Sequence, residues 1–118
     1  MTAILSQVEK FLKDFKSKMS IWDVFFRDDR GKNTKTLAEL EISPTERKRI
    51  LEELVVTDYS EGPLEDILNK GNDMWVFGKT VKKREVYIKI TMGIEGSRVV
   101  CISFHIAEHL MNYPFKRK

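Results

Sequence analysis

The first part of the chain has the spacing of an amphipathic helix. Apolar side chains recur every three or four residues from Ile4 to Met19, with lysines and an aspartate between them. This period places the apolar residues on one face, so we predict a helix of about four turns over this range. From residue 20 to residue 27 the spacing changes, and Trp22, Val24 and Phe26 alternate with their neighbours. A period of two is typical of a strand, and we predict one here.

The middle of the chain combines turn formers with two further helix signals. Residues 28–33 are rich in Asp, Gly and Asn, which predicts a turn after the first strand. A short helix is expected over residues 35–41. The run Ser43-Pro44-Thr45-Glu46 then supplies a capping serine, a proline for the first helical position and the glutamate of a capping box. Residues 57–73 are polar and include Gly62-Pro63, so we predict a long loop without regular structure, either functional or mobile.

The last part of the chain has the composition of β structure. Strands are predicted at residues 74–81, 85–92 and 98–104, and both connections between them are short enough for hairpins. The three strands should therefore form an antiparallel meander. We predict one α+β domain over residues 1–118, with helices packed on one side of an antiparallel sheet. Its parts are a helical part with the first strand and the long loop (1–73), the antiparallel strands (74–105) and a basic tail (106–118).

Side-chain alternation divides the second and third of these strands into two faces. The apolar rows are expected to face the core together (Val86, Ile88, Ile90 and Met92 with Val100, Ile102 and Phe104). The opposite face then carries a polar row (Tyr87, Lys89, Cys101, Ser103 and His105). Arg84 and Lys79 would join its rim, although Lys79 reaches it only if Gly78 forms a β-bulge that shifts the alternation.

Charge is distributed unevenly along the chain. Residues 1–69 carry 11 Lys/Arg and 14 Asp/Glu, a balance of −3, whereas residues 70–118 carry 10 Lys/Arg and 4 Asp/Glu, a balance of +6. This asymmetry fits an anionic partner on the face built by the second half. Basic side chains that merely solvate strand surfaces and the tail would give the same balance.

Several classes of protein are disfavoured. No apolar run is long enough to span a bilayer, and the first ten residues lack the basic start and apolar core of a signal peptide, so we expect a cytoplasmic protein without membrane contact. The single cysteine, Cys101, cannot form an internal disulfide and lies in an apolar run, which predicts a buried thiol. Gly-rich phosphate loops and paired cysteines are missing from the sequence.

The polar face of the strands has the groups that RNA cleavage by internal attack requires. The 2′-hydroxyl needs a base, the leaving 5′-oxygen needs an acid, and the crowded phosphorane needs positive charge. A phenol, an imidazole and several lysines or arginines can fill these roles without a metal ion. The same surface can also bind phosphates without cutting them. Alternatively, Tyr87 and His105 are only partly buried neighbours on adjacent strands.

A second motif involves the same histidine. His105-Ile106-Ala107-Glu108-His109 has the H-x-x-E-H spacing of inverted zinc peptidases. That chemistry needs both histidines on one face of a substantial helix and a distal carboxylate ligand. Here the motif follows a strand directly and Pro114 comes soon after it, so a zinc enzyme remains only an alternative hypothesis and we expect no metal site.

Three segments of the sequence resemble the MqsR toxins, which belong to the RelE-like superfamily of bacterial toxin–antitoxin ribonucleases. These are Met74-Trp75-Val76-Phe77-Gly78-Lys79, Glu85-Val86-Tyr87-Ile88-Lys89-Ile90-Thr91 and Cys101-Ile102-Ser103-Phe104-His105. The likeness extends over about two-thirds of the chain, from Leu37 onward. It implies a RelE-like fold and a metal-independent endoribonuclease that needs no cofactor. Such an enzyme cuts messenger RNA, free or on the ribosome, is a monomer when free and is silenced by its own antitoxin protein.

The resemblance also implies roles for individual residues. The catalytic tyrosine of the family corresponds to Tyr87, and the basic residue after the last strand's Ser-Phe corresponds to His105, where the better-known members have lysine. At two other positions the sequence differs from the family: it has Glu61 where the family has a lysine, and Val76 where the family has a glutamine. The RNA-binding charge would then come from other cations (Lys79, Arg84, Lys89 and Arg98). A non-catalytic module that binds RNA or a protein on the same scaffold is the alternative function.

Overall fold

The computed structural model describes residues 3–28, 31–66 and 71–116. Three α-helices and five strands form in this part of the chain, together with one 3-10 turn at Val56–Asp58. The helices are α1 (Leu5–Trp22), α2 (Lys32–Leu40) and α3 (Pro44–Glu52). The strands are β1 (Val24–Phe26), β2 (Tyr59–Leu64), β3 (Met74–Val81), β4 (Arg84–Thr91) and β5 (Val99–Ile106).

The strands form one mixed sheet with the order β1-β5-β4-β3-β2. The predicted antiparallel meander of β3, β4 and β5 is confirmed, and β2 extends it at the β3 edge. The prediction of a wholly antiparallel sheet is wrong, because β1 pairs with β5 in parallel. A long connection carries the chain from β1 through two helices and three strands before it returns to β5, and this allows the parallel pairing.

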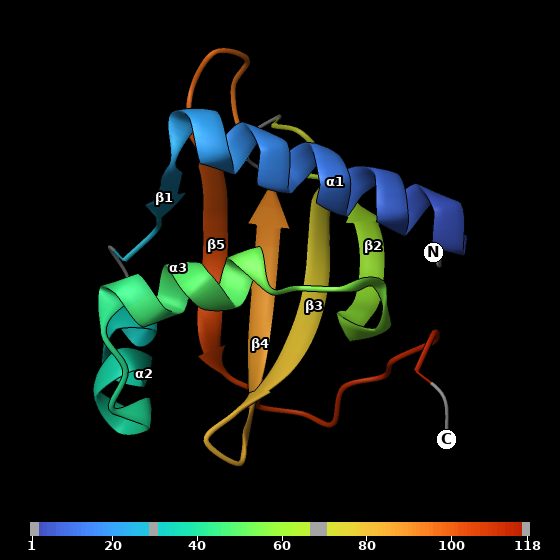
Figure 1. Ribbon diagram of the computed structural model, residues 1–118. Coiled ribbons are helices and arrows are strands. Elements are labelled where there is room, and N and C mark those ends of the chain that lie inside the picture. The colour runs from blue at the N-terminus through green and yellow to red at the C-terminus, as the bar shows by residue number, and fades with distance from the viewer. Residues whose placement is uncertain (1–2, 29–30, 67–70, 117–118) are drawn as a thin grey trace.

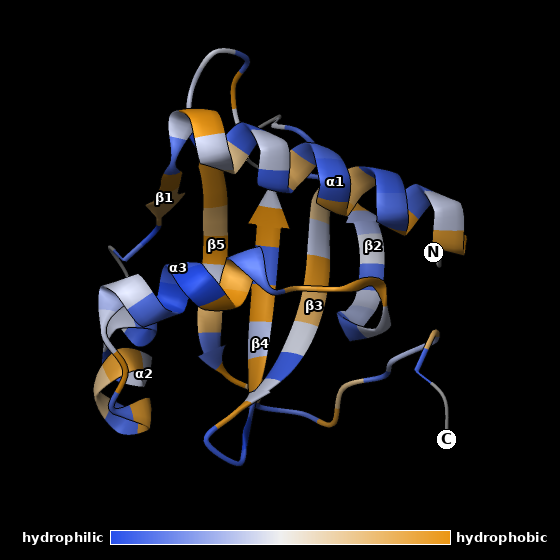
Figure 2. Ribbon diagram, in the orientation of Figure 1, coloured by the Kyte–Doolittle hydropathy of each residue, from blue (hydrophilic) through white to orange (hydrophobic). Residues whose placement is uncertain are grey.

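The helices cover one face of the sheet, and α1 crosses the strands at their upper end in Figure 1. Its inward side chains (Val8, Phe11, Leu12, Phe15 and Met19) are buried, as the sequence period predicts. Apolar residues concentrate in the middle of the strands beneath them, as Figure 2 shows. None of the helices in the described residues lies over the opposite face, and we call it the outer face. None of the described helices is long and apolar enough to cross a membrane.

Several predicted boundaries need correction. The helix α1 continues to Trp22, so only the end of the predicted strand at 20–27 is a strand. The predicted turn at 28–33 is also partly wrong, because α2 begins at Lys32 after Gly31, whose φ of 76° is easily reached by glycine. The capping box before α3 is confirmed: the Ser43 hydroxyl accepts from the Glu46 amide at 3.1 Å. The predicted loop at 57–73 instead contains the strand β2.

A β-bulge in β5 changes which side chains reach each face. Lys89 pairs with Ser103, but Ile90 pairs with Cys101, so Ile102 is an extra residue in β5. Cys101 therefore faces the core and is fully buried, which confirms the buried thiol and contradicts its predicted place on the polar face. Burial raises the pKa of this thiol. Val100 and Ile102, predicted to face the core, are instead half-buried on the outer face.

Candidate functional site

Two rows of side chains cross the outer face of the sheet in register. In the first row Glu61 pairs with Val76, Val76 with Lys89, and Lys89 with Ser103. In the second row Gly78 pairs with Tyr87, and Tyr87 with His105. The shared face predicted for Tyr87, Lys89, Ser103 and His105 is thus confirmed.

A cavity of about 700 Å³, here called the polar cavity, lies over these rows. Its floor is formed by strand residues (Glu61, Tyr87, Lys89, Ser103 and His105), and its wall by residues 108–112 of the segment that follows β5. Sequence reasoning placed four of the floor residues there, but it missed the wall. The wall comes from a segment without hydrophobic periodicity, so its place over the sheet leaves no signal in the sequence.

Tyr87 and His105 are in direct contact in the polar cavity. Their rings stack with centroids 5.1 Å apart and planes 14° from parallel. The Nδ1 atom of His105 lies 3.0 Å from the carbonyl oxygen of Ile106. A carbonyl oxygen can only accept, so the hydrogen bond assigns a proton to Nδ1 and leaves the lone pair of a neutral imidazole on Nε2. His105 can therefore take up a proton at Nε2.

The environment of Tyr87 favours its protonated form. Partial burial raises the pKa of the Tyr87 phenol, and the nearby Glu61 carboxylate raises it further. The phenol is therefore a proton donor at neutral pH. The ammonium group of Lys89 lies 5.9 Å from the centroid of the Tyr87 ring and supplies positive charge in the same cavity. Acid, base and cation are thus held within one cavity by two neighbouring strands.

The other predicted cations lie elsewhere. Lys79 pairs with Val86 in an uninterrupted register, so the predicted bulge at Gly78 is absent and Lys79 lies on the helix-covered side. Its ammonium group contacts Asp58 at 3.0 Å. Arg84 is exposed at the hairpin end of β4, and the Arg98 guanidinium lies 5.0 Å from the Phe25 ring centroid at the far edge. Only Lys89 of the four predicted phosphate-binding residues lines the polar cavity.

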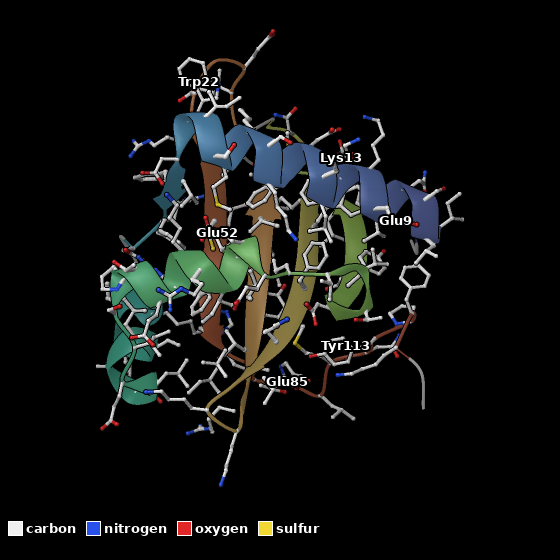
Figure 3. All side chains as sticks on the ribbon, viewed as in Figure 1. Glu9, Lys13, Trp22, Glu52, Glu85 and Tyr113 are labelled. Atoms are coloured by element: carbon white, nitrogen blue, oxygen red, sulfur yellow. The ribbon has the colours of Figure 1, made fainter. Side chains whose placement is uncertain are left out.

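Residues 107–116, which we call the tail, are held against the end of the sheet. The Tyr113 hydroxyl donates to Glu85 at 2.7 Å, and the two side chains lie together in Figure 3. Phe115 stacks on the buried Tyr59 with centroids 5.4 Å apart. Closer to β5, Glu108 pairs with Lys32 at 2.8 Å, and this contact lowers the pKa of the Glu108 carboxyl. These contacts fix the wall of the polar cavity.

Gly78 allows the tail to approach the sheet. A Cβ atom at this position would overlap the Tyr113 hydroxyl oxygen. We therefore expect Gly78→Ala to displace the tail and to destabilise the protein by about 1–3 kcal/mol, the usual cost of overpacking. Hydrogen exchange should rise over residues 107–116 and stay unchanged in α1.

The double variant Gly78→Ala/Tyr113→Ala provides the matched control, since it removes the clash but also the Glu85 contact. It should be no less stable than Tyr113→Ala alone. If Gly78→Ala leaves tail exchange at the wild-type level, the tail does not depend on this contact.

The geometry of the H-x-x-E-H segment differs from that of a zinc peptidase. His105 lies in β5, whereas Glu108 and His109 are exposed in the tail, outside any helix. In the described part of the chain, no group of three or more His, Cys, Asp or Glu side chains is close enough to hold a metal ion. His109 lines the polar cavity, so it belongs to the site as a second imidazole, a role that the sequence pattern did not indicate.

Asn33 positions the strand that carries Ser103 and His105. Its side chain is buried, with Nδ2 donating to the carbonyl oxygens of Arg27 at 2.6 Å and Ile102 at 3.3 Å. Its Oδ1 accepts from the Phe104 amide at 2.9 Å. The side chain thus continues the edge pairing of β5 beyond the end of β1.

Comparison of the chain with known protein families, curated proteins and solved structures gives no match.

Proposed function

We propose that this protein is an endoribonuclease that cleaves messenger RNA by internal attack and needs no metal ion. The observation that carries the proposal is the contact between Tyr87 and His105 in a cavity that also contains Lys89. A protonated phenol, an imidazole with its lone pair on Nε2 and a cation are the three groups that this reaction needs. The strand register holds them on a rigid scaffold.

Each residue has a defined role in this reaction. The Nε2 atom of His105 accepts the proton of the RNA 2′-hydroxyl, and the oxygen attacks the adjacent phosphorus. The bond from phosphorus to the 5′-oxygen breaks, and the Tyr87 phenol gives its proton to that oxygen. The products are a 2′,3′-cyclic phosphate and a free 5′-hydroxyl. Lys89 stabilises the negative charge that develops on the phosphorane.

The resemblance to the MqsR toxins, within the RelE-like superfamily, supports the same reaction. The family positions at Glu61, Val76, Tyr87 and His105 lie in two adjacent rows of the outer face. By this resemblance we propose a cytoplasmic toxin that acts on free or ribosome-bound message and is silenced by an antitoxin protein. Glu61 places an anion where the family has a cation, so Lys89 has the main electrostatic role.

The test is cleavage of single-stranded RNA by the purified protein in the presence of a chelator. We expect fragments that end in a 2′,3′-cyclic phosphate, and growth arrest when the protein is expressed. The double variant Tyr87→Phe/His105→Ala should lose both effects. Intact free and ribosome-bound RNA, together with equal toxicity of the double variant, would exclude the proposal.

A second candidate function is RNA binding without cleavage. The Glu61 carboxylate in the polar cavity favours it, because an anion near the scissile phosphate opposes the charge that develops there. Tight binding that weakens with salt, without any cleaved product, would identify this function.

A further inference from the structure

The outer face has a second cavity, of about 930 Å³, at the opposite end of the strands from the tail. Trp22 marks this end in Figure 3, whereas Tyr113 and Glu85 mark the other. Apolar side chains from α1, β1, β5 and the β4–β5 connection form its walls (Trp22, Phe25, Met92, Ile94, Val100 and Ile102). We call it the apolar cavity. The bulge in β5 creates it, because it turns Val100 and Ile102 away from the core.

Large apolar side chains remain in contact with solvent around this cavity. Trp22 is 47% exposed, Phe25 44% and Ile94 78%. A cluster of exposed apolar side chains is typical of a binding surface, since burying these side chains against a ligand is favourable. The two aromatic rings offer flat surfaces for stacking.

The apolar cavity adjoins the polar cavity along two strands. Ile102 lines the first and Ser103 the second, while Thr91 and Lys89 are two residues apart on one face of β4. At a rise of about 3.3 Å per residue, these lining residues are about 3–7 Å apart along the strands. Neighbouring nucleotides of one strand can therefore occupy both.

Charged groups at the apolar cavity indicate the chemistry of its ligand. Lys18 and Arg27 line it, and the Arg98 guanidinium lies over the Phe25 ring. Arg27 forms no ion pair within the described residues. Aromatic rings beside cations are the features that bind single-stranded nucleic acid, through base stacking and phosphate contacts. Carboxylates at the rim, such as Glu95, can accept hydrogen bonds from base amino groups.

We propose that the apolar cavity binds unstacked bases of the RNA strand whose phosphate lies in the polar cavity. This inference rests on the proposed function, because it extends the substrate from the scissile phosphate to its neighbours. Trp22 and Phe25 stack on the bases, and the cations hold the intervening backbone. The cavity thereby contributes affinity and base preference, while the polar cavity performs the cleavage.

The chain offers an internal reporter, since Trp22 lines the apolar cavity and the other tryptophan, Trp75, stacks on Phe11 beneath α1. In a Trp75→Phe background, Trp22 emission should be quenched by a 2′-O-methyl RNA octamer, which lacks the attacking hydroxyl and cannot be cleaved. An octamer backbone without bases should bind more weakly and leave the emission unchanged. Failure of the methylated octamer to quench Trp22 would overturn the proposal.

Substitutions separate this proposal from the proposed function. Trp22→Ala and Phe25→Ala should each raise the Kd for the methylated octamer about tenfold, the change expected for a lost stacking contact. Val55→Ala, at a site 49% exposed near the helices, is the matched control and should leave the Kd unchanged. Cleavage of RNA by Val55→Ala should likewise stay at the wild-type rate.

The outcomes distinguish the two proposals. Quenching by RNA in a protein that never cleaves RNA would refute the endoribonuclease but support the base-binding cavity. Normal RNA affinity of Trp22→Ala and Phe25→Ala in an active enzyme would refute the cavity's role in RNA binding. If those variants bind RNA normally but lose a protein partner, the apolar cavity is a protein interface and the proposal is wrong.

Discussion

The variant His105→Gln should cleave RNA about 10²–10⁴ times more slowly than the wild-type protein, the usual contribution of one general acid or base. Glutamine retains a polar side chain of similar reach but cannot take up a proton. Because the Nδ1 proton is held by the Ile106 carbonyl, loss of Nε2 removes the proton acceptor of the site. The rate should be measured on a dinucleotide under single-turnover conditions, so that product release does not hide the effect.

His109→Gln is the matched control, since His109 is the other histidine of the chain and also lines the polar cavity. It is exposed in the tail and we expect a loss below about tenfold. If both substitutions reduce the rate equally, the two imidazoles act together, and Tyr87 is not the acid. An unchanged rate in His105→Gln would contradict the mechanism directly.

The pH dependence of the cleavage rate provides a further test of the mechanism. The rate should depend on the protonation of the Tyr87 phenol, because only the protonated form can give a proton to the leaving oxygen. The raised pKa of the Tyr87 phenol keeps this acid protonated well into the alkaline range, so no decline is expected below about pH 10. Tyr87→Phe should lower the rate over the whole pH range. Tyr113→Phe, which leaves the Tyr87 phenol in place, should keep the wild-type shape.

The face that carries Tyr87 and His105 could be predicted because β3, β4 and the end of β5 pair without interruption. Over such a stretch a period of two decides which side chains are buried. The rule failed at Ile102, because a β-bulge shifts the alternation without a mark in the sequence. Val100 and Cys101 consequently exchange faces. The apolar cavity was missed for this reason.

Other parts of the site lacked any periodic signal. The strand β2 contains Gly62-Pro63, and its pairing with β3 is irregular at two points, which an edge strand tolerates. The sequence therefore predicted a loop here, and no position on the sheet was predicted for Glu61. Asn33 looked like a turn residue, since asparagine is common in turns. Its role depends on the partners of one side chain far along the chain, at Ile102 and Phe104.

Asn33→Leu should destabilise the protein by about 3 kcal/mol and also reduce its activity. Leucine has a similar volume but leaves the carbonyl oxygens of Arg27 and Ile102 and the buried Phe104 amide without this partner. Each unsatisfied buried group costs about 1–3 kcal/mol, and the carbonyl oxygens less where other donors reach them. Urea unfolding monitored by Trp75 should show a lower midpoint with an unchanged slope.

The loss of activity should persist under conditions in which the variant is folded, because Ser103 and His105 flank the residue that Asn33 holds. Thr34→Ala is the matched control in the same turn of α2: Thr34 is exposed, its hydroxyl donates only to the Gly31 carbonyl, and both stability and activity should change little. Asn33→Asp keeps the acceptor for the Phe104 amide but loses both donated hydrogen bonds. It therefore separates the effect of the accepted hydrogen bond from that of the donated ones. If folded Asn33→Leu cleaves RNA at the wild-type rate, the bulged end of β5 keeps His105 in place without Asn33. The positioning role assigned to this residue would then be wrong, whereas the cost in stability would remain.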